Sequence, residues 1–150
     1  MGIEYRIIEM DTWPRVAGAY AYDVEGALKN EGGFLQSQYT RGQKMKVKVG
    51  DFAFILLNNQ KNNQENQIKY LCKIVKCNIV RKIRVIDKYE INAIKDNGVT
   101  EMYMELKLES ECPDGSLSKN DLTALGLNEK QNHGNKVRGE LLDYLMKYFN

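Results

Sequence analysis

The sequence contains few of the residues that catalytic and metal sites most often use. Its single histidine, His133, lies in the polar stretch from Lys130 to Asn135, where a side chain is hard to hold in a fixed position. Most nucleophile–histidine pairs and most zinc sites with a histidine ligand would depend on this residue. Cys72 and Cys77 are expected on opposite faces of a strand, so their thiols could not easily bind the same metal ion. Phosphate-loop, dinucleotide-binding and zinc-protease motifs are missing, so we expect no catalysis, cofactor or metal.

Long apolar runs and a disulfide framework are missing as well. The longest apolar run, Phe52 to Leu57, has six residues, whereas a membrane-spanning helix needs about 18. The start of the sequence has no basic segment followed by an apolar one, so we expect no secretory signal. Three cysteines, an odd number, fit a reducing compartment. With 150 residues, 43% of them hydrophobic, we expect one domain over residues 1–150, in the cytoplasm and not in a membrane.

Charge is distributed unevenly along the chain, although the net charge is only +2. Between Arg41 and Lys88 there are twelve Lys and Arg residues against three Asp and Glu, and the remainder carries ten against seventeen. Such polarity can bring a polyanion to one side of the molecule, although a solvated strand face would have similar lysines. The candidates for phosphate contacts are Arg41, Lys44, Lys46, Lys73, Lys82 and Arg84.

Hydrophobic alternation predicts a series of strands with short helices near the two ends of the chain. The strands are expected over 4–10, 52–57, 68–77, 79–87 and an arm in which Met102, Met104, Leu106 and Leu108 share one face. Asp23 is expected to cap a short helix, 31–36 to form a glycine-hinged loop, and 118–125 and 137–149 to form helices. Strands and helices do not alternate. We therefore expect an α+β fold, a mixed β-barrel of about five or six strands flanked by short helices.

Three passages carry a resemblance to a known family. They are the glycine-aromatic loop Gly32 to Gln36, the basic entry into a buried strand from Lys46 to Phe54, and the strand Ile68 to Val75. In this order they resemble EVE domains, relatives of the PUA and YTH folds. The passages 122–127 and 139–145 are similar to the tail of EVE-like modules in modification-dependent restriction systems. Together these passages cover most of residues 30–150. Cys72-Lys73 departs from the family pattern, in which small residues and glycine are usual.

The resemblance implies a PUA-like, non-catalytic module that reads a modified base. The expected partner is double-stranded DNA with a modified cytosine such as 5-methylcytosine. Such modules usually bind the modified base in an aromatic-lined pocket, after it has swung out of the duplex. A nuclease or NTPase domain or subunit is implied as a further partner. Family members often hold a tryptophan in the first strand, whereas Trp13 follows that strand and precedes Pro14.

The chemistry of several side chains in the first third of the sequence suits a base pocket, independently of the family resemblance. A flipped base loses a few kcal/mol of stacking and pairing, and aromatic faces can return about 1–3 kcal/mol per base. Amides and hydroxyls can bond a Watson–Crick edge, and glycine allows close backbone approach. The pocket candidates are Trp13, Tyr20, Tyr22, Gly33, Phe34, Gln36, Ser37 and Tyr39. The same rings could simply close the mouth of a barrel.

Two alternatives to a DNA reader remain open at this point. A β-barrel with basic loops can equally bind RNA, as PUA relatives do. The acidic N- and C-terminal parts could instead dock a protein partner without any nucleic acid.

Overall fold

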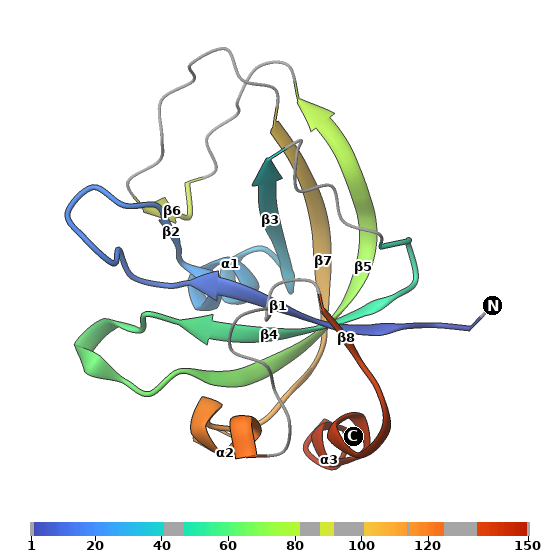
Figure 1. Ribbon diagram of the computed structural model, residues 1–150. Coiled ribbons are helices and arrows are strands. Elements are labelled where there is room, and N and C mark those ends of the chain that lie inside the picture. The colour runs from blue at the N-terminus through green and yellow to red at the C-terminus, as the bar shows by residue number, and fades with distance from the viewer. Residues whose placement is uncertain are drawn as a thin grey trace.

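The computed structural model of the protein describes residues 2–40, 47–81, 88–91, 101–113, 115–124 and 135–149 (Figure 1). The elements in chain order are β1 (Tyr5–Asp11), β2 (Ala21–Tyr22), α1 (Val24–Asn30), β3 (Phe34–Thr40), β4 (Phe52–Asn58), the short 3-10 helix η2 (Lys61–Asn63), β5 (Gln67–Arg81), β6 (Glu90–Ile91), β7 (Glu101–Glu111), α2 (Lys119–Ala124), β8 (Asn135–Val137) and α3 (Gly139–Met146). In the described part of the chain, no helix is long and apolar enough to cross a membrane.

Six strands form one curved, mixed sheet. Their order is β3-β7-β5-β4-β1-β8, and β2 and β6 pair separately. β1 and β4 run parallel, and the other neighbours in the sheet are antiparallel. The long β5 pairs with both β4 and β7, and its ladders are interrupted by register shifts that bend and twist a strand. Within the described residues β3 has one sheet neighbour, so the expected barrel is open at β3.

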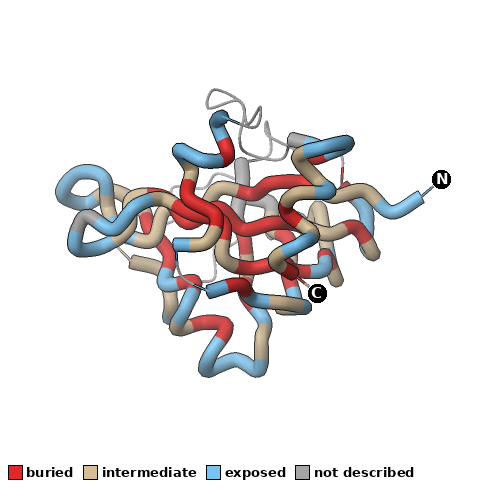
Figure 2. Tube along the Cα trace, turned by 90° about the horizontal axis from the view of Figure 1, so that it is seen from below, coloured by how far each residue is buried: buried red, intermediate tan, exposed pale blue. Residues whose placement is uncertain are grey.

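The sheet separates two hydrophobic cores. Figure 2 shows in red the buried segments of the chain. The inner core fills the curl and includes Ile8, Leu35, Ile55, Ile74 and Met104, which come from five strands. The outer core packs β1, β4 and β5 against the segments of α2 and α3, which lie beneath the sheet in Figure 1. Both faces of β4 are covered, which explains why the chain from Phe52 to Leu57 is an apolar run without alternation.

Local sequence accounts for α1 and for the turn into β3. The Asp23 side chain accepts a hydrogen bond from the Gly26 N–H at 3.0 Å, as expected of an N-cap. Val24, Ala27 and Leu28 lie at helical spacing and are buried in the inner core. Gly33 follows with a φ of +91°, a conformation that glycine adopts without strain.

Several predictions of elements are confirmed and three need correction. The helix expected over 137–149 spans only Gly139–Met146, because Val137 belongs to β8 and pairs with Tyr5 of β1. The burial of Met104 and Leu106 confirms the alternating arm, and Ser118 accepts a hydrogen bond from the Asp121 N–H at the start of α2. The expected loop 31–36 is wrong beyond residue 33, because pairing with β7 extends the chain from Phe34 onward. The two stretches expected over 68–77 and 79–87 are joined through Arg81 in one strand, with Asn78 at a φ of +51°.

Candidate functional site

A cavity of about 250 Å³ lies where the curved sheet fails to close. β1 and β3 are not neighbours in the sheet, yet both contribute to its wall, and the segment between β1 and β2 covers it. We call it the sheet-gap cavity. Its lining consists of Glu9, Met10, Asp11, Arg15, Tyr20, Tyr22 and Ser37. The volume corresponds to about eight water molecules at roughly 30 Å³ each in the liquid, so one planar ring of cytosine size fits.

Opposite charges meet on the β1 side of the sheet-gap cavity. The guanidinium of Arg15 lies 3.7 Å from a Glu9 carboxylate oxygen and 3.5 Å from an Asp11 oxygen. These separations are longer than a strong charge-assisted hydrogen bond, and 60% of the Arg15 side chain is exposed. Arg15 is therefore close enough to neutralise part of the charge of Glu9 and Asp11. Because it is loosely held, its guanidinium can also turn toward a ligand.

A chain of amides fixes the position of Asp11. Asn58 donates from its Nδ2 to Asp11 Oδ1 at 2.8 Å, and its own Oδ1 accepts from Asn66 Nδ2 at 2.6 Å. Asn58 is 4% exposed and sits at the end of β4, in register with Asp11. One carboxylate oxygen of Asp11 is thus held from inside the protein, which orients the other toward Arg15 and the cavity.

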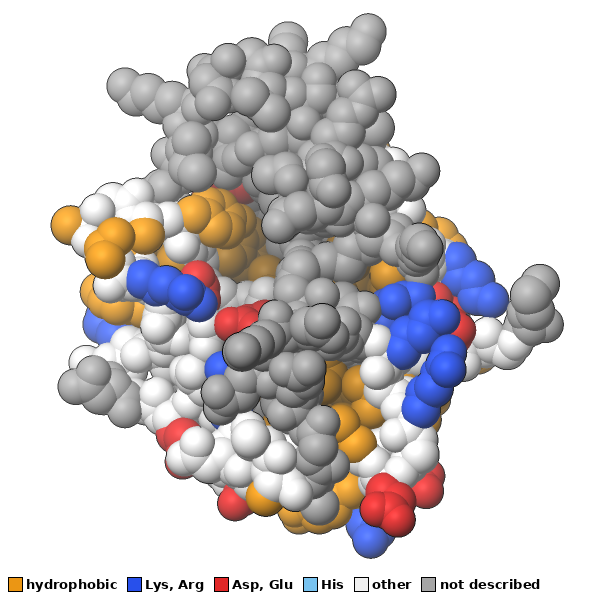
Figure 3. Space-filling model, in the orientation of Figure 1, with side chains coloured by type: hydrophobic (Ala, Val, Ile, Leu, Met, Phe, Trp, Pro, Cys, Tyr) orange, Lys and Arg blue, Asp and Glu red, His pale blue; other side chains and the backbone are white. Residues whose placement is uncertain are grey.

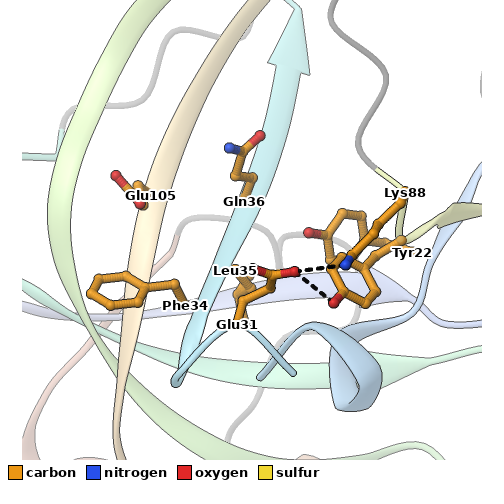
Figure 4. A pocket seen from close by; sticks show the side chains of 8 residues that line it. Tyr22, Glu31, Phe34, Leu35, Gln36, Lys88 and Glu105 are labelled. Atoms are coloured by element: carbon orange, nitrogen blue, oxygen red, sulfur yellow. Dashed lines mark hydrogen bonds and ion pairs between the residues drawn. The ribbon is translucent and has the colours of Figure 1, made fainter. Parts of the chain in front are cut away.

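A second cavity, of about 480 Å³, lies beside β3, and Figure 4 shows its lining. We call it the β3-edge cavity. Tyr22 lines it together with Phe34 and Gln36, but the Phe34 ring points away from Tyr22, so the rings do not form a sandwich (Figure 4). The Tyr89 hydroxyl donates to Glu31 Oε1 at 2.7 Å, and Lys88 Nζ lies 3.1 Å from the same oxygen.

These contacts perturb the charged groups of the β3-edge cavity. The hydrogen bond from Tyr89, with a further contribution from Lys88, holds the pKa of Glu31 below its usual value. Glu31 in turn raises the pKa of Lys88. The three side chains already satisfy one another and tie the end of α1 to the start of β6. The sheet-gap cavity is the better candidate site, because its Arg15 is held less tightly than the Lys88 of the β3-edge cavity.

The predicted pocket residues with described side chains, and Gly33, lie in three cavities and one turn. Tyr20, Tyr22 and Ser37 meet in the sheet-gap cavity, whereas Phe34 and Gln36 line the β3-edge cavity. Trp13 lines a third cavity, described below, and Gly33 lies in the turn before β3. The Tyr39 side chain lies outside the described residues.

Most of the predicted phosphate contacts cannot be placed. Lys73 is exposed on β5, opposite Phe52 of β4, and does not line the three cavities named here. The remaining five lie outside the described residues: Arg41, Lys44, Lys46, Lys82 and Arg84.

Sequence reasoning missed Glu9, Met10, Asp11 and Arg15. In the sequence they belong to the end of a strand and the turn after it, which is an ordinary place for charged residues. The available signal was their position next to Trp13-Pro14, since loops that follow a rigid strand often carry binding residues. That they face Ser37 follows from the curl of the sheet and has no local signature.

Described cations gather elsewhere on the molecule. Figure 3 shows Lys and Arg side chains beside the N-terminal segment, where Lys136 and Arg138 lie 3.0 and 3.6 Å from a Glu4 oxygen. Arg6 contacts the other oxygen of Glu4, and these contacts keep the Glu4 pKa low, with the hydrogen bond from Lys136 contributing most. This cluster is at the start of β1, roughly 20 Å from its other end at 3.3 Å per residue. The sheet-gap cavity itself carries two acids and one Arg, so it suits a neutral ring better than a phosphate.

Comparison with known proteins identifies the fold. No family model matches the sequence, and no curated protein matches it. Similar solved structures include the human THYN1 protein in complex with 5-methylcytosine-containing DNA, at 15% identity and a TM-score of 0.62 over 96% of both chains. The DUF55 domain of human thymocyte nuclear protein 1 has 14% identity and a TM-score of 0.55, over 94% of this chain and 83% of that one. A hypothetical protein from Leishmania major has 13% identity and a TM-score of 0.60, over 97% and 94%. The chain therefore has this PUA-like α+β fold.

Proposed function

We propose that the chain is a non-catalytic DNA-binding module that holds a modified cytosine, turned out of the duplex, in the sheet-gap cavity. The observation that carries the proposal is the arrangement of Glu9, Asp11 and Arg15 beside Tyr20 and Tyr22 in a space of about 250 Å³. The fold supports it, because a protein of similar fold was crystallised with 5-methylcytosine-containing DNA.

The polar groups of the cavity match cytosine better than thymine. Cytosine offers an amino group as donor, which carboxylates accept, and its ring nitrogen and carbonyl oxygen are acceptors. Asp11, held by Asn58, supplies the carboxylate, and Arg15 supplies donors for the two acceptors. Thymine would place a carbonyl against the acid. The arrangement thus favours cytosine in two ways, because it attracts the polar groups of cytosine and repels the carbonyl of thymine.

Preference for a methyl group would come from the apolar part of the wall. Met10 is 7% exposed, packs in the inner core and lines the cavity, and its thioether adapts to small changes in shape. Burying one methyl group contributes on the order of 0.8 kcal/mol, which is about a fourfold preference. We therefore expect modest discrimination between 5-methylcytosine and cytosine, and stronger discrimination between cytosine and thymine.

Affinity for the duplex would come from phosphate contacts outside the cavity. The cations between Arg41 and Lys88 that the sequence analysis singled out are the candidates. Contacts of this kind release counterions, so binding should weaken steeply as the salt concentration rises. We propose no chemistry on the bound base, because the Glu9 and Asp11 carboxylates share Arg15 and act as hydrogen-bond acceptors. A nuclease or NTPase that acts on the recognised DNA remains part of the proposal.

The test compares the dissociation constants of matched duplexes that carry 5-methylcytosine, cytosine or thymine at one position, for the native chain and for Asp11→Asn. The variant presents an amide nitrogen where a carboxylate oxygen was, which repels the cytosine amino group and favours the thymine carbonyl. We expect the preference for cytosine over thymine to fall by about 1–3 kcal/mol, or roughly 5- to 150-fold.

The matched control is Asp143→Asn, because Asp143 is exposed on α3 and lies outside the three cavities. It should leave all three constants unchanged. Equal affinity of the native chain for the three duplexes would contradict the proposal. Tighter binding to RNA of the same sequence would favour the RNA module.

A further inference from the structure

The only tryptophan of the sequence, Trp13, is 43% exposed. It lies in the segment between β1 and β2, and the Lys61 ammonium sits 4.9 Å from the centre of its ring. At this exposure the indole presents a large aromatic surface to solvent, on which a flat ring can stack. A cation over the ring marks a face that an electron-poor group can approach.

Trp13 forms one wall of a cavity of about 410 Å³, which we call the Trp13 cavity. Its floor contains the apolar side chains of Leu57, Val24 and Ile91, while Glu25 and Glu90 add carboxylates. Lys61 and Gln60 lie on the side of the 3-10 helix η2, and the Gln60 amide donates to the Glu65 carbonyl. The remaining lining is polar or charged and includes Asp23, Lys88 and Tyr89. An aromatic wall and apolar side chains beside many hydrogen-bonding groups suit a flat ring with polar edges.

The Trp13 cavity and the sheet-gap cavity share the segment from Asp11 to Arg15. Asp11 and Arg15 line the sheet-gap cavity, and Trp13, two residues from each of them, lines the other. Thr12, Trp13 and Arg15 lie at bends of this segment, so side chains that are close in sequence line the two cavities. A ligand with two neighbouring ring systems could therefore occupy both cavities.

We propose that the Trp13 cavity binds the nucleobase next to the flipped one, with that base stacked on the indole ring. This inference rests on the proposed function, because it needs the modified base in the sheet-gap cavity. The flipped base has already left the stack, so its neighbour loses one stacking partner, and the indole ring takes the place of that partner. The module is then a reader of two adjacent bases.

The charged groups of the Trp13 cavity fit a base better than an apolar peptide. Glu25 and Glu90 can accept hydrogen bonds from amino and imino groups of a base. Lys61, already over the indole, can turn to the phosphate that accompanies the incoming base. Aromatic stacking tolerates every base, so sequence context is set by these carboxylates and is weaker than the preference for the modified base.

Because the chain has one tryptophan, its fluorescence reports directly on this cavity. The native chain is titrated with a duplex containing one 5-methylcytosine, and with two further duplexes that have an abasic position on the 5′ or the 3′ side of it. We expect the intact duplex to quench the emission and one of the two abasic duplexes to bind without quenching. An emission unchanged at saturation by the intact duplex would overturn the inference.

Variants supply the second readout. Trp13→Ala should bind the modified duplex roughly 5- to 100-fold more weakly, and Trp13→Phe should recover most of the loss. Val16→Ala, in the same segment and 70% exposed, is the matched control and should bind like the native chain. Circular dichroism and urea unfolding check that Trp13→Ala is folded.

The two proposals fail in different ways. Native affinity in Trp13→Ala, with the preference for the modified duplex intact, overturns the inference and leaves the proposed function standing. Loss of any preference in the native chain overturns the proposed function, whatever Trp13 does.

Discussion

The outer core and the inner core share the strands β1, β4 and β5 but are closed to different degrees. In the outer core Phe54 is fully buried, stacks near Tyr5 and meets Phe149 at a ring distance of 5.5 Å, while Leu117, Leu122 and Leu145 complete the packing. The inner core is also well packed at its centre, but the sheet-gap cavity interrupts it where β3 and β1 do not pair. The outer core is thus closed by α2 and α3, whereas the inner side has an opening where β1 and β3 do not pair.

The largest expected effect comes from the outer core. Phe54→Ala removes a fully buried ring, so the free energy of unfolding should fall by about 3–5 kcal/mol. Urea unfolding measures the loss. The fraction that remains folded should keep the native preference among duplexes, because the cavity residues lie elsewhere; a changed preference would mean that the two cores are not separable.

An intermediate effect is expected on the opposite side of the sheet. Ser37 is 3% exposed and lines the sheet-gap cavity, so Ser37→Leu fills space that a base would occupy. We expect the affinity for the modified duplex to fall by about 1–3 kcal/mol, and the preference for the modified over the unmodified duplex to be lost. Fluorescence anisotropy with labelled duplexes measures it. Ser110→Leu, also on a strand but outside the three cavities, should bind normally; the same loss in both variants would count against the cavity.

The smallest effect concerns thiols. Burial raises the pKa of Cys72 from about 9 to about 12, so the folded chain keeps a proton that the unfolded chain releases in this range. This contribution to stability is therefore complete below pH 9 and is lost as the pH rises toward 12, by about 1.4 kcal/mol per pH unit. Unfolding midpoints between pH 8 and 10 should fall less steeply in Cys72→Ala than in the native chain. An identical slope would show that Cys72 does not contribute.

Local patterns predicted part of this architecture well. The Asp23 cap, the alternating arm with Met104 and Leu106, and the apolar strand from Phe52 depend on neighbours in sequence, and the structure confirms them. The start of β3 at Phe34 and the union of two stretches into β5 depend on pairing with β7, which is distant in the chain. Local propensity cannot report such pairing.

The residues of the candidate site also divide into those that the sequence can indicate and those that depend on distant pairing. Tyr20, Tyr22 and Ser37 could be nominated from their residue types, because aromatic rings and hydroxyls suit a base wherever they lie. Glu9, Asp11 and Arg15 have a role only through their position opposite β3. Their ion pairs and the support from Asn58 are consequences of the curl of the sheet, and the sequence alone does not indicate the curl.

The central claim is that the sheet-gap cavity, between β1 and β3, binds a cytosine that has turned out of the duplex. The most direct test is the imino proton spectrum of a short duplex with one 5-methylcytosine, recorded free and saturated with the native chain. The account predicts that the imino signal of the guanine opposite the modified base disappears on binding, because an unpaired guanine exchanges this proton with water, while signals of distant pairs remain. An unchanged guanine signal in the saturated complex would show that the base stays paired and would contradict the account.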